Sequence, residues 1–233
     1  KFSGTLEVTS EITYKQTGDE AQLLAKLQFP FFIDRNRSRA AKKLQEAYKC
    51  DVIISDDGLQ HYAMGREIEI AVIDGIRRLG NGLVFPAGPL REPKSRLKEV
   101  DFIVNNGGPT ESNEILMTLK PGKFVHLKSG KQYSIDNWPM HKQVHGVAGV
   151  GNPNRFFDLL SQLGFEFDKS PFPDHHKYNK RDLYYLDHLP ILMTEKDASK
   201  CMHFDNSKIW YLSIEASIES QFIDRLEEKL NDR

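Results

Sequence analysis

The sequence contains few of the residues that build disulfide scaffolds, and it has no run that could form a membrane helix. Cys50 and Cys201 are its only cysteines, and their spacing fits no metal-binding motif. This usage favours a reducing compartment. No apolar stretch approaches the roughly 20 residues of a membrane-spanning helix, and no signal peptide is recognised.

The sequence also lacks an excess of charge of either sign. It has 32 basic and 33 acidic residues and a formal net charge of −1, so the overall charge predicts no nucleic-acid partner. Its length of 233 residues, with 39% hydrophobic and 28% charged residues, suits one large globular domain or two modest ones. Basic residues cluster at 35–39, 77–78 and 91–98. These clusters indicate either a solvated surface or a phosphate-binding site beside carboxylates.

Residues 51–62 combine a short apolar run with a dense group of polar side chains. Residues 52–54 are β-branched and too few for a helix, which predicts a buried strand. Ligands of open α/β sheets collect beyond the carboxyl ends of such strands. Asp56, Asp57, Gln60 and His61 would lie there, where burial is costly unless they bind something.

Two interpretations of the two aspartates stay open. Asp and Gly are favoured in turns, so Asp56, Asp57 and Gly58 can be only a turn. Alternatively, two hard carboxylates after an apolar strand resemble the acidic strand end that holds Mg²⁺ in phosphate-transferring enzymes.

The pattern of apolar residues predicts an α/β fold built on a doubly wound sheet. A loss of periodicity at 128–143 predicts a boundary or a peripheral hairpin, which separates a first unit at 1–127 from a second, smaller α/β unit at 144–233. We expect helices at 21–27, 38–48, 154–163, 180–188 and 217–230, and strands at 29–33, 52–54, 70–73, 101–105, 144–150, 191–194 and 209–212.

Three further segments carry candidate functional residues. Residues 81–93 contain two glycines and three prolines and include Arg91, which indicates either a stiff functional loop or a surface connector. Asp174 could orient the imidazole of His175 for proton transfer, although a surface histidine pair is the plainer interpretation. Asp19 and Glu20 suit a helix start. The glycine loop at 149–153 lacks the third glycine of a dinucleotide fingerprint.

Taken together, these segments resemble the tetraacyldisaccharide 4′-kinase family of the lipid A pathway. The resemblance is carried by Gly-Asp-Glu at 18–20, Ser-Asp-Asp-Gly-Leu-Gln-His-Tyr at 55–62, the run 85–93 and Phe-Pro-Asp-His-His at 172–176. Residues 149–157 and 194–197 agree as well, so the resemblance extends over essentially the whole chain. It implies a P-loop NTPase-like, doubly wound and mostly parallel sheet.

The sequence departs from the family in its amino-terminal part. It has no Gly-x-x-x-x-Gly-Lys-Thr-type phosphate loop, which in the family lies upstream of the matching segments. It also has no apolar amino-terminal helix of the kind the family uses at the membrane, and it begins at Lys1. We therefore expect that this part is absent, that the sheet is incomplete there, and that the chain alone is inactive. Ala21 stands where the family commonly has Pro, which should alter helix entry rather than chemistry.

The resemblance implies ATP and Mg²⁺ as cofactors and an acylated glucosamine disaccharide 1-phosphate as acceptor. The γ-phosphoryl group would pass to the 4′-hydroxyl of this acceptor. The implied site residues are catalytic Asp19, His175 and Arg91, metal-binding Asp57, Asp56 and Glu20, and supporting Gln60, His61 and Asp174. In this scheme Asp19 and His175 form the dyad that deprotonates the hydroxyl.

The resemblance also implies a peripheral protein at the cytoplasmic face of the inner membrane, which it contacts through the absent amino-terminal part. Two other functions remain open. The first is a Mg²⁺-dependent phosphotransferase that acts on a soluble small molecule. The second is a non-catalytic fragment or interaction module that keeps the fold without the nucleotide loop.

Overall fold

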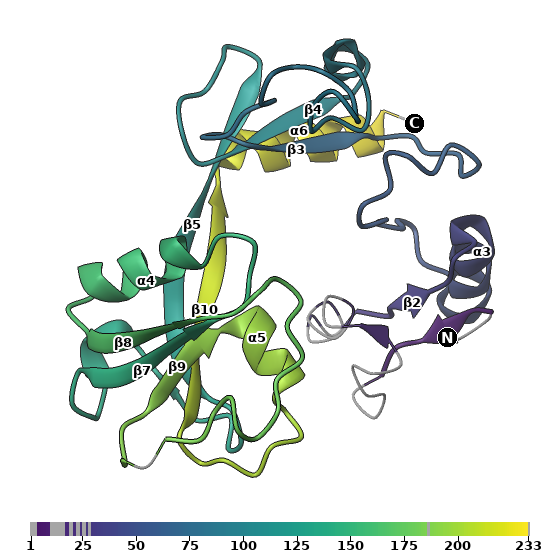
Figure 1. Cartoon of the computed structure of the whole chain (residues 1–233). Helices are drawn as coiled ribbons and strands as arrows, with labels where there is room; N and C mark the ends of the chain where they lie inside the picture. The colour runs from purple at the N-terminus through teal and green to yellow at the C-terminus, as the bar shows by residue number, and fades with distance from the viewer. Residues whose placement is uncertain are drawn as a thin grey trace. The chain divides into compact units, whose positions relative to one another are not determined.

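The chain folds into two compact units, each built from two separate segments (Figure 1). The structure is a computed structural model that describes residues 4–9, 17–18, 21, 24, 27, 29–185 and 187–232. The first unit comprises residues 1–54 and 121–214, and the second comprises residues 55–120 and 215–233. The described part of the chain contains no helix whose length and hydropathy would let it span a bilayer.

The larger part of the first unit is a sheet with two helices. Its strands follow the order β5-β10-β9-β7-β8, and the β7–β8, β7–β9 and β9–β10 pairs are parallel. The elements are β5 (Glu114–His126), β7 (Gln143–Ala148), α4 (Pro153–Gln162), β8 (Glu166–Pro171), β9 (Ile191–Thr194), α5 (Glu195–Lys200) and β10 (Ile209–Ile218). This arrangement confirms the predicted mixed α/β class with a mostly parallel sheet.

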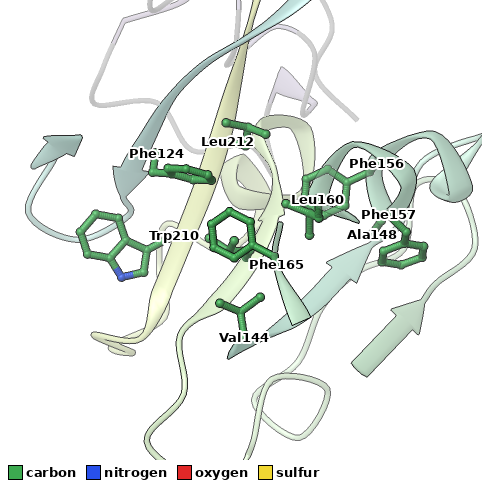
Figure 2. Packing of buried hydrophobic residues seen from close by; sticks show 10 residues of the cluster. Phe124, Val144, Ala148, Phe156, Phe157, Leu160, Phe165, Trp210 and Leu212 are labelled. Atoms are coloured by element: carbon green, nitrogen blue, oxygen red, sulfur yellow. The ribbon is translucent and has the colours of Figure 1, made fainter. Parts of the chain in front are cut away.

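The core of this sheet explains why the apolar runs form strands. Figure 2 shows Phe156, Phe157 and Leu160 of α4 packed with Val144 and Leu212 from the strands. A second cluster contains Met193, Ile209 and the buried thiol of Cys201. These side chains are almost fully buried, and such burial is the main driving force for folding.

The second unit is a smaller sheet covered by the carboxyl-terminal helix (Figure 1). Strands β3 (Ile70–Asp74) and β4 (Phe102–Asn106) are parallel, and β4 is also parallel to the first part of β5. Phe222 of α6 (Ser220–Asn231) packs edge-on against Phe102, with ring centroids 5.3 Å apart. A short 3₁₀ helix, η1 (Lys94–Lys98), follows the proline-rich loop.

Within the first unit, residues 29–54 and the described residues 4–9 contain a pair of short strands and a helix. Strands β1 (Leu6–Glu7) and β2 (Phe32–Ile33) pair antiparallel, and α3 (Arg37–Tyr48) follows β2. The Asn36 side chain caps α3 by accepting from the Arg39 N–H at 3.0 Å, as expected for Asn at a helix start. The predicted helix at 21–27 lies mostly outside the described residues.

The predicted strand at 52–54 is wrong. Residues 52–54 adopt no regular structure, and Ile54 is 90% exposed. β-Branched residues favour strands only where a partner strand and a packed face are available. No described strand pairs with these three residues.

The predicted helix at 180–188 is wrong as well. Its described residues form turns, in which Asp182 accepts from the Asn179 N–H (2.9 Å) and side chain (2.8 Å). Asp and Asn compete with helix formation through such local hydrogen bonds. Asp182 is also held by His176 Nε2 at 3.0 Å.

The two units do not follow the predicted boundaries at 127 and 143. Strands β5 and β10 each have residues in both units, so the division falls within these strands. Segment 128–143 contains β6 (Gln132–Tyr133), which pairs antiparallel with the end of β5, and η2 (Ile135–Asn137). Because β10 continues to Ile218, α6 begins at Ser220, three residues later than expected.

Candidate functional site

A tight turn presents the carboxylate of Asp57 to solvent. Asp56 and Asp57 occupy a turn, and Asp57 has a left-handed backbone with φ of 47°. Aspartate tolerates this conformation better than most residues with a side chain. The turn interpretation is therefore correct for the backbone, and both carboxylates lie on exposed residues where they are accessible to a ligand.

Arg91 meets Asp57 and Gln60 within the second unit. Its Nη1 lies 3.2 Å from Asp57 Oδ2 and 3.4 Å from Gln60 Oε1. The side chains of Arg91 and Asp57 are 68% and 69% exposed, and such an exposed pair contributes about 0–1 kcal/mol. Either charge can therefore turn to a bound phosphate or cation at little cost.

Glu92 links the aspartate turn to the proline-rich loop, and its role was missed by sequence reasoning. Gln60 Nε2 donates to Glu92 Oε1 at 2.6 Å. This bond, together with a hydrogen bond from Tyr62, lowers the pKa of the Glu92 carboxyl. Arg96 contacts Glu92 at 3.4 Å and Glu69 at 2.6 Å. Glu92 lies next to the predicted Arg91, but sequence position alone did not indicate its partner.

The proline-rich loop has an ordered but irregular backbone, as predicted. The Phe85 N–H donates to the Leu90 carbonyl at 2.8 Å, and the Leu90 N–H donates to the Leu83 carbonyl at 3.2 Å. The Asn81 side chain donates to the Ala87 carbonyl at 2.9 Å. These bonds close the loop on itself and fix the backbone that leads to Arg91.

In the first unit, three segments meet at one edge of the sheet. Strands β7, β8 and β9 are parallel, so their carboxyl ends lie at the same edge. The glycine loop at 149–152 follows β7, the segment 172–176 follows β8, and α5 follows β9. Such an edge is where open α/β sheets bind ligands.

Asp174 and His175 lie together at this edge. Asp174 Oδ1 accepts from the His175 N–H at 2.9 Å, and Asp174 Oδ2 lies 3.8 Å from His175 Nε2. His175 has a left-handed backbone with φ of 57°, and its side chain is 61% exposed. Lys196 Nζ lies 3.7 Å from Asp174 Oδ1. The imidazole of His175 is thus largely exposed to solvent and lies beside a carboxylate.

Asp197 is a second residue whose tertiary role sequence reasoning missed. It reads as an acid in the first turn of α5, and Thr194 does cap that helix by accepting from the Asp197 N–H at 3.1 Å. However, the Asp197 side chain is fully buried and forms an ion pair with Lys200 at 2.9 Å. A Thr-x-x-Asp spacing is typical of a helix cap, but nothing in the local sequence indicates that Asp197 is buried.

Of the remaining predicted site residues, the structure describes His61 but neither Asp19 nor Glu20. Asp19 and Glu20 lie outside the described residues, so their meeting with His175 and the cation stays a prediction. His61 contributes backbone bonds to the turn, where its N–H donates to the Gly58 carbonyl at 3.0 Å. The Asp57–Arg91 group and the Asp174–His175 group belong to different compact units.

The carboxylates of Asp56 and Asp57 suit a magnesium ion that is shared with phosphate. Among the residues that the structure describes, no three His, Cys, Asp or Glu side chains form a metal site. Mg²⁺ commonly uses only one or two carboxylates and completes its shell with water and substrate phosphate oxygens. The oxygen donors of this turn fit that incomplete set.

The comparisons with known proteins agree on one family. The sequence model of LpxK, tetraacyldisaccharide-1-P 4′-kinase, matches residues 1–231. A tetraacyldisaccharide 4′-kinase from Ruthia magnifica is 45% identical over 97% of this chain and 72% of its own length, and one from Legionella pneumophila strain Corby is 46% identical over 93% and 66%. A crystal structure of LpxK from Aquifex aeolicus in complex with ATP shares the fold, with a TM-score of 0.80, 21% identity and coverage of 100% of this chain and 75% of that chain. The chain belongs to the tetraacyldisaccharide-1-P 4′-kinase family.

Proposed function

We propose that this chain contributes acceptor-side and cation-binding residues to an ATP-dependent kinase that phosphorylates the 4′-hydroxyl of a tetraacyldisaccharide 1-phosphate. The observation that carries the proposal is the meeting of Asp57, Gln60 and Arg91 on two exposed loops. Family membership supports the substrate, because relatives of about 45% identity are named for this activity. The chain spans about two thirds to three quarters of the relatives' length, so the activity belongs to the complete protein.

The first task of these residues is to hold the transferred phosphoryl group. Asp57, with Asp56 and Glu20, would hold Mg²⁺, which neutralises charge on the ATP phosphates. Arg91 carries a planar fork of N–H donors that matches phosphate oxygens in a fixed orientation. The pair of Arg91 and Asp57 is exposed and weak, which supports this role. A bound phosphate can replace Asp57 as the partner of Arg91, and a bound cation can replace Arg91 as the partner of Asp57.

The second task is to remove the proton of the acceptor hydroxyl. His175 would accept that proton on its imidazole while the oxygen attacks the γ-phosphorus, and Asp19 would stabilise the resulting imidazolium. Asp174, 3.8 Å from His175 Nε2, adds a second negative charge beside the ring. Gln60 and Glu92 orient the loop that carries Arg91.

The acceptor carries fatty acyl chains, and this supports a location of the complete protein at a membrane surface. By the family resemblance this surface is the cytoplasmic face of the inner membrane. Binding of the complete protein to phospholipid vesicles, measured by flotation, tests this point. Failure to float would contradict the membrane location without affecting the assignment of the reaction.

The direct test is phosphorylation by the product of the whole reading frame that encodes this chain. Labelled ATP and Mg²⁺ should transfer phosphate to a tetraacylated disaccharide 1-phosphate in detergent, with little transfer to water-soluble sugars. The reverse preference would favour a phosphotransferase for soluble substrates. No transfer to either acceptor would favour a non-catalytic module.

The metal assignment has its own test. Asp57→Asn should lower turnover and shift the Mg²⁺ concentration for half-maximal activity upward, because a neutral amide is a poorer ligand for a hard cation. Asp51→Asn, a change at an exposed aspartate before the turn, is the matched control. Wild-type turnover of Asp57→Asn at every Mg²⁺ concentration would remove Asp57 from the metal site.

A further inference from the structure

The ion pair of Asp197 and Lys200 is buried and belongs to none of the predicted site residues. Its side chains are 0% and 5% exposed, and Lys200 Nζ lies 2.9 Å from Asp197 Oδ1. Burial removes the hydration of both charges. Proteins in which such a pair is replaced by apolar residues of similar volume are often equally stable. The pair is therefore better explained by the geometry that it fixes than by the stability that it adds.

The pair holds both backbone polar groups of Gly149, the first residue after β7. The Gly149 N–H donates to Asp197 Oδ2 at 2.8 Å, and Lys200 Nζ donates to the Gly149 carbonyl at 3.5 Å. The Thr194 hydroxyl donates to the same Asp197 oxygen at 2.7 Å. The carboxyl end of β7 is thus tied to the first turn of α5.

Gly149 in turn supports both ends of the segment that carries Asp174 and His175. A Cβ atom on Gly149 would lie 2.7 Å from Tyr178 Oη and 3.3 Å from Phe172 Cβ, so only glycine allows these side chains to pack against the backbone. The Phe172 N–H also donates to the Ala148 carbonyl at 2.8 Å. The rings of Phe172 and Tyr178 contact each other, with centroids 5.2 Å apart.

We propose that Asp197 and Lys200 are positioning residues that hold Gly149 and, through Phe172 and Tyr178, set the orientation of His175. This inference rests on the proposed function, in which His175 takes the proton of the acceptor hydroxyl. Asp197 and Lys200 act only through the backbone of Gly149 and need no contact with substrate. Their loss should slow the chemical step and leave nucleotide binding intact.

The kinetic test replaces both charges at once in the complete protein, so that no buried charge is left without its partner. Asp197→Asn with Lys200→Met should lower kcat at least tenfold and leave KM for ATP within twofold of wild type. The matched control is Asp205→Asn with Lys128→Met, which removes an ion pair of the same type whose side chains are 85% and 58% exposed in the same unit. The control should keep wild-type kcat.

A spectroscopic readout separates this inference from the kinase assignment. The imidazole resonances of His175, recorded by NMR without substrate, should move in the Asp197–Lys200 double variant and stay in place in the control. If wild-type protein phosphorylates no acceptor, the proposed function fails, while the NMR comparison still tests positioning. His175 resonances that match wild type overturn the proposal, and so does a wild-type kcat in the double variant.

Thr194→Val provides a milder variant in case the double variant does not fold. It removes one hydroxyl that donates to Asp197 and keeps both charges. The His175 resonances should then move in the same direction by a smaller amount. A folded Thr194→Val protein with unchanged His175 resonances would equally overturn the proposal.

Discussion

Glu114 is the buried carboxylate on which the charge network of the second unit depends. Its side chain is 3% exposed and contacts Arg78 at 2.6 Å, and Asn105 Nδ2 donates to it at 2.8 Å. The hydrogen bond from Arg78 lowers the pKa of Glu114 to about 2 from 4.5. Because the folded-state pKa is depressed, the charged form stabilises the folded protein above about pH 4.5, and this stabilisation is lost as the pH falls toward 2.

Glu114→Gln should therefore lower the free energy of unfolding at pH 7 by about 1–3 kcal/mol. The difference from wild type should shrink as the pH falls from about 5 to about 2. Denaturant unfolding at several pH values measures this difference. Glu111→Gln is the control, because Glu111 contacts the same Arg78 but its side chain is 72% exposed. A difference that does not depend on pH would contradict the assignment.

Arg91 should not tolerate replacement by lysine. Lysine keeps the positive charge but loses the planar guanidinium, whose N–H donors match two phosphate oxygens at once. In the complete protein, Arg91→Lys should reduce kcat/KM by about 10- to 100-fold. Arg77→Lys, an exposed change in the same unit, should have no effect. Equal activity of both variants would show that Arg91 acts only as a charge.

At the residue scale, the sequence indicated some of the contacts between candidate site residues but not those that depend on distant parts of the chain. Asp57, Gln60 and Arg91 were expected to act together, and the structure brings them within hydrogen-bonding distance. Glu92 and Asp197 were missed because their roles depend on contacts across many residues, such as that of Asp197 with Gly149. Local patterns carry no information about such contacts.

At the scale of elements, Gly75 shows how closely the loops after β3 and β4 approach each other. A Cβ on Gly75 would lie 1.8 Å from the Gly107 carbonyl oxygen and 1.9 Å from Asn105 Oδ1. These distances are far below van der Waals contact, and the neighbours are backbone and a fully buried side chain. The two strand ends could not keep this geometry with any larger residue.

Gly75→Ala should destabilise the protein by about 3 kcal/mol or more, because the overlap can be relieved only by moving backbone. Thermal and denaturant unfolding measure the loss. Gly65→Ala is the matched control, because a Cβ there meets nothing within 4 Å, and it should change stability little. An equal effect of the two substitutions would argue against the close approach of the two loops.

The elements that the sequence predicted well are those whose pattern and packing agree. The strand at 191–194 is apolar and almost fully buried, and α4 places Phe156, Phe157 and Leu160 on one buried face. Residues 52–54 have a similar apolar pattern but no described strand beside them. The segment 180–188 has helical composition, but Asp182 holds it in turns. A short stretch of sequence does not show whether a neighbouring strand or a competing hydrogen bond is available to it.

At the scale of the whole molecule, the absence of a phosphate loop from these 233 residues has a measurable consequence. The backbone amides and lysine of such a loop supply most contacts to ATP phosphates in P-loop enzymes. Calorimetry should therefore find that this chain binds ATP–Mg²⁺ only weakly, with a Kd above about 1 mM, which corresponds to about −4 kcal/mol. The product of the whole reading frame should bind more tightly.

The two proteins are compared in the same buffer, with the reaction product ADP as a second ligand. Tight binding of ATP by this chain alone would show a nucleotide site that the family resemblance does not predict. Absence of binding by both proteins would favour the non-catalytic module.

The second unit joins residues 55–120 to residues 215–233, which the ribosome makes only after the intervening residues 121–214. Until α6 emerges, Phe102 and Val104 have no Phe222 to cover them. The unit therefore cannot complete its core until α6 has left the ribosome, after residues 121–214 have been made. A ribosome that stalls before α6 emerges would leave a nascent protein with an exposed sheet face, which is the kind of surface that chaperones and proteases recognise.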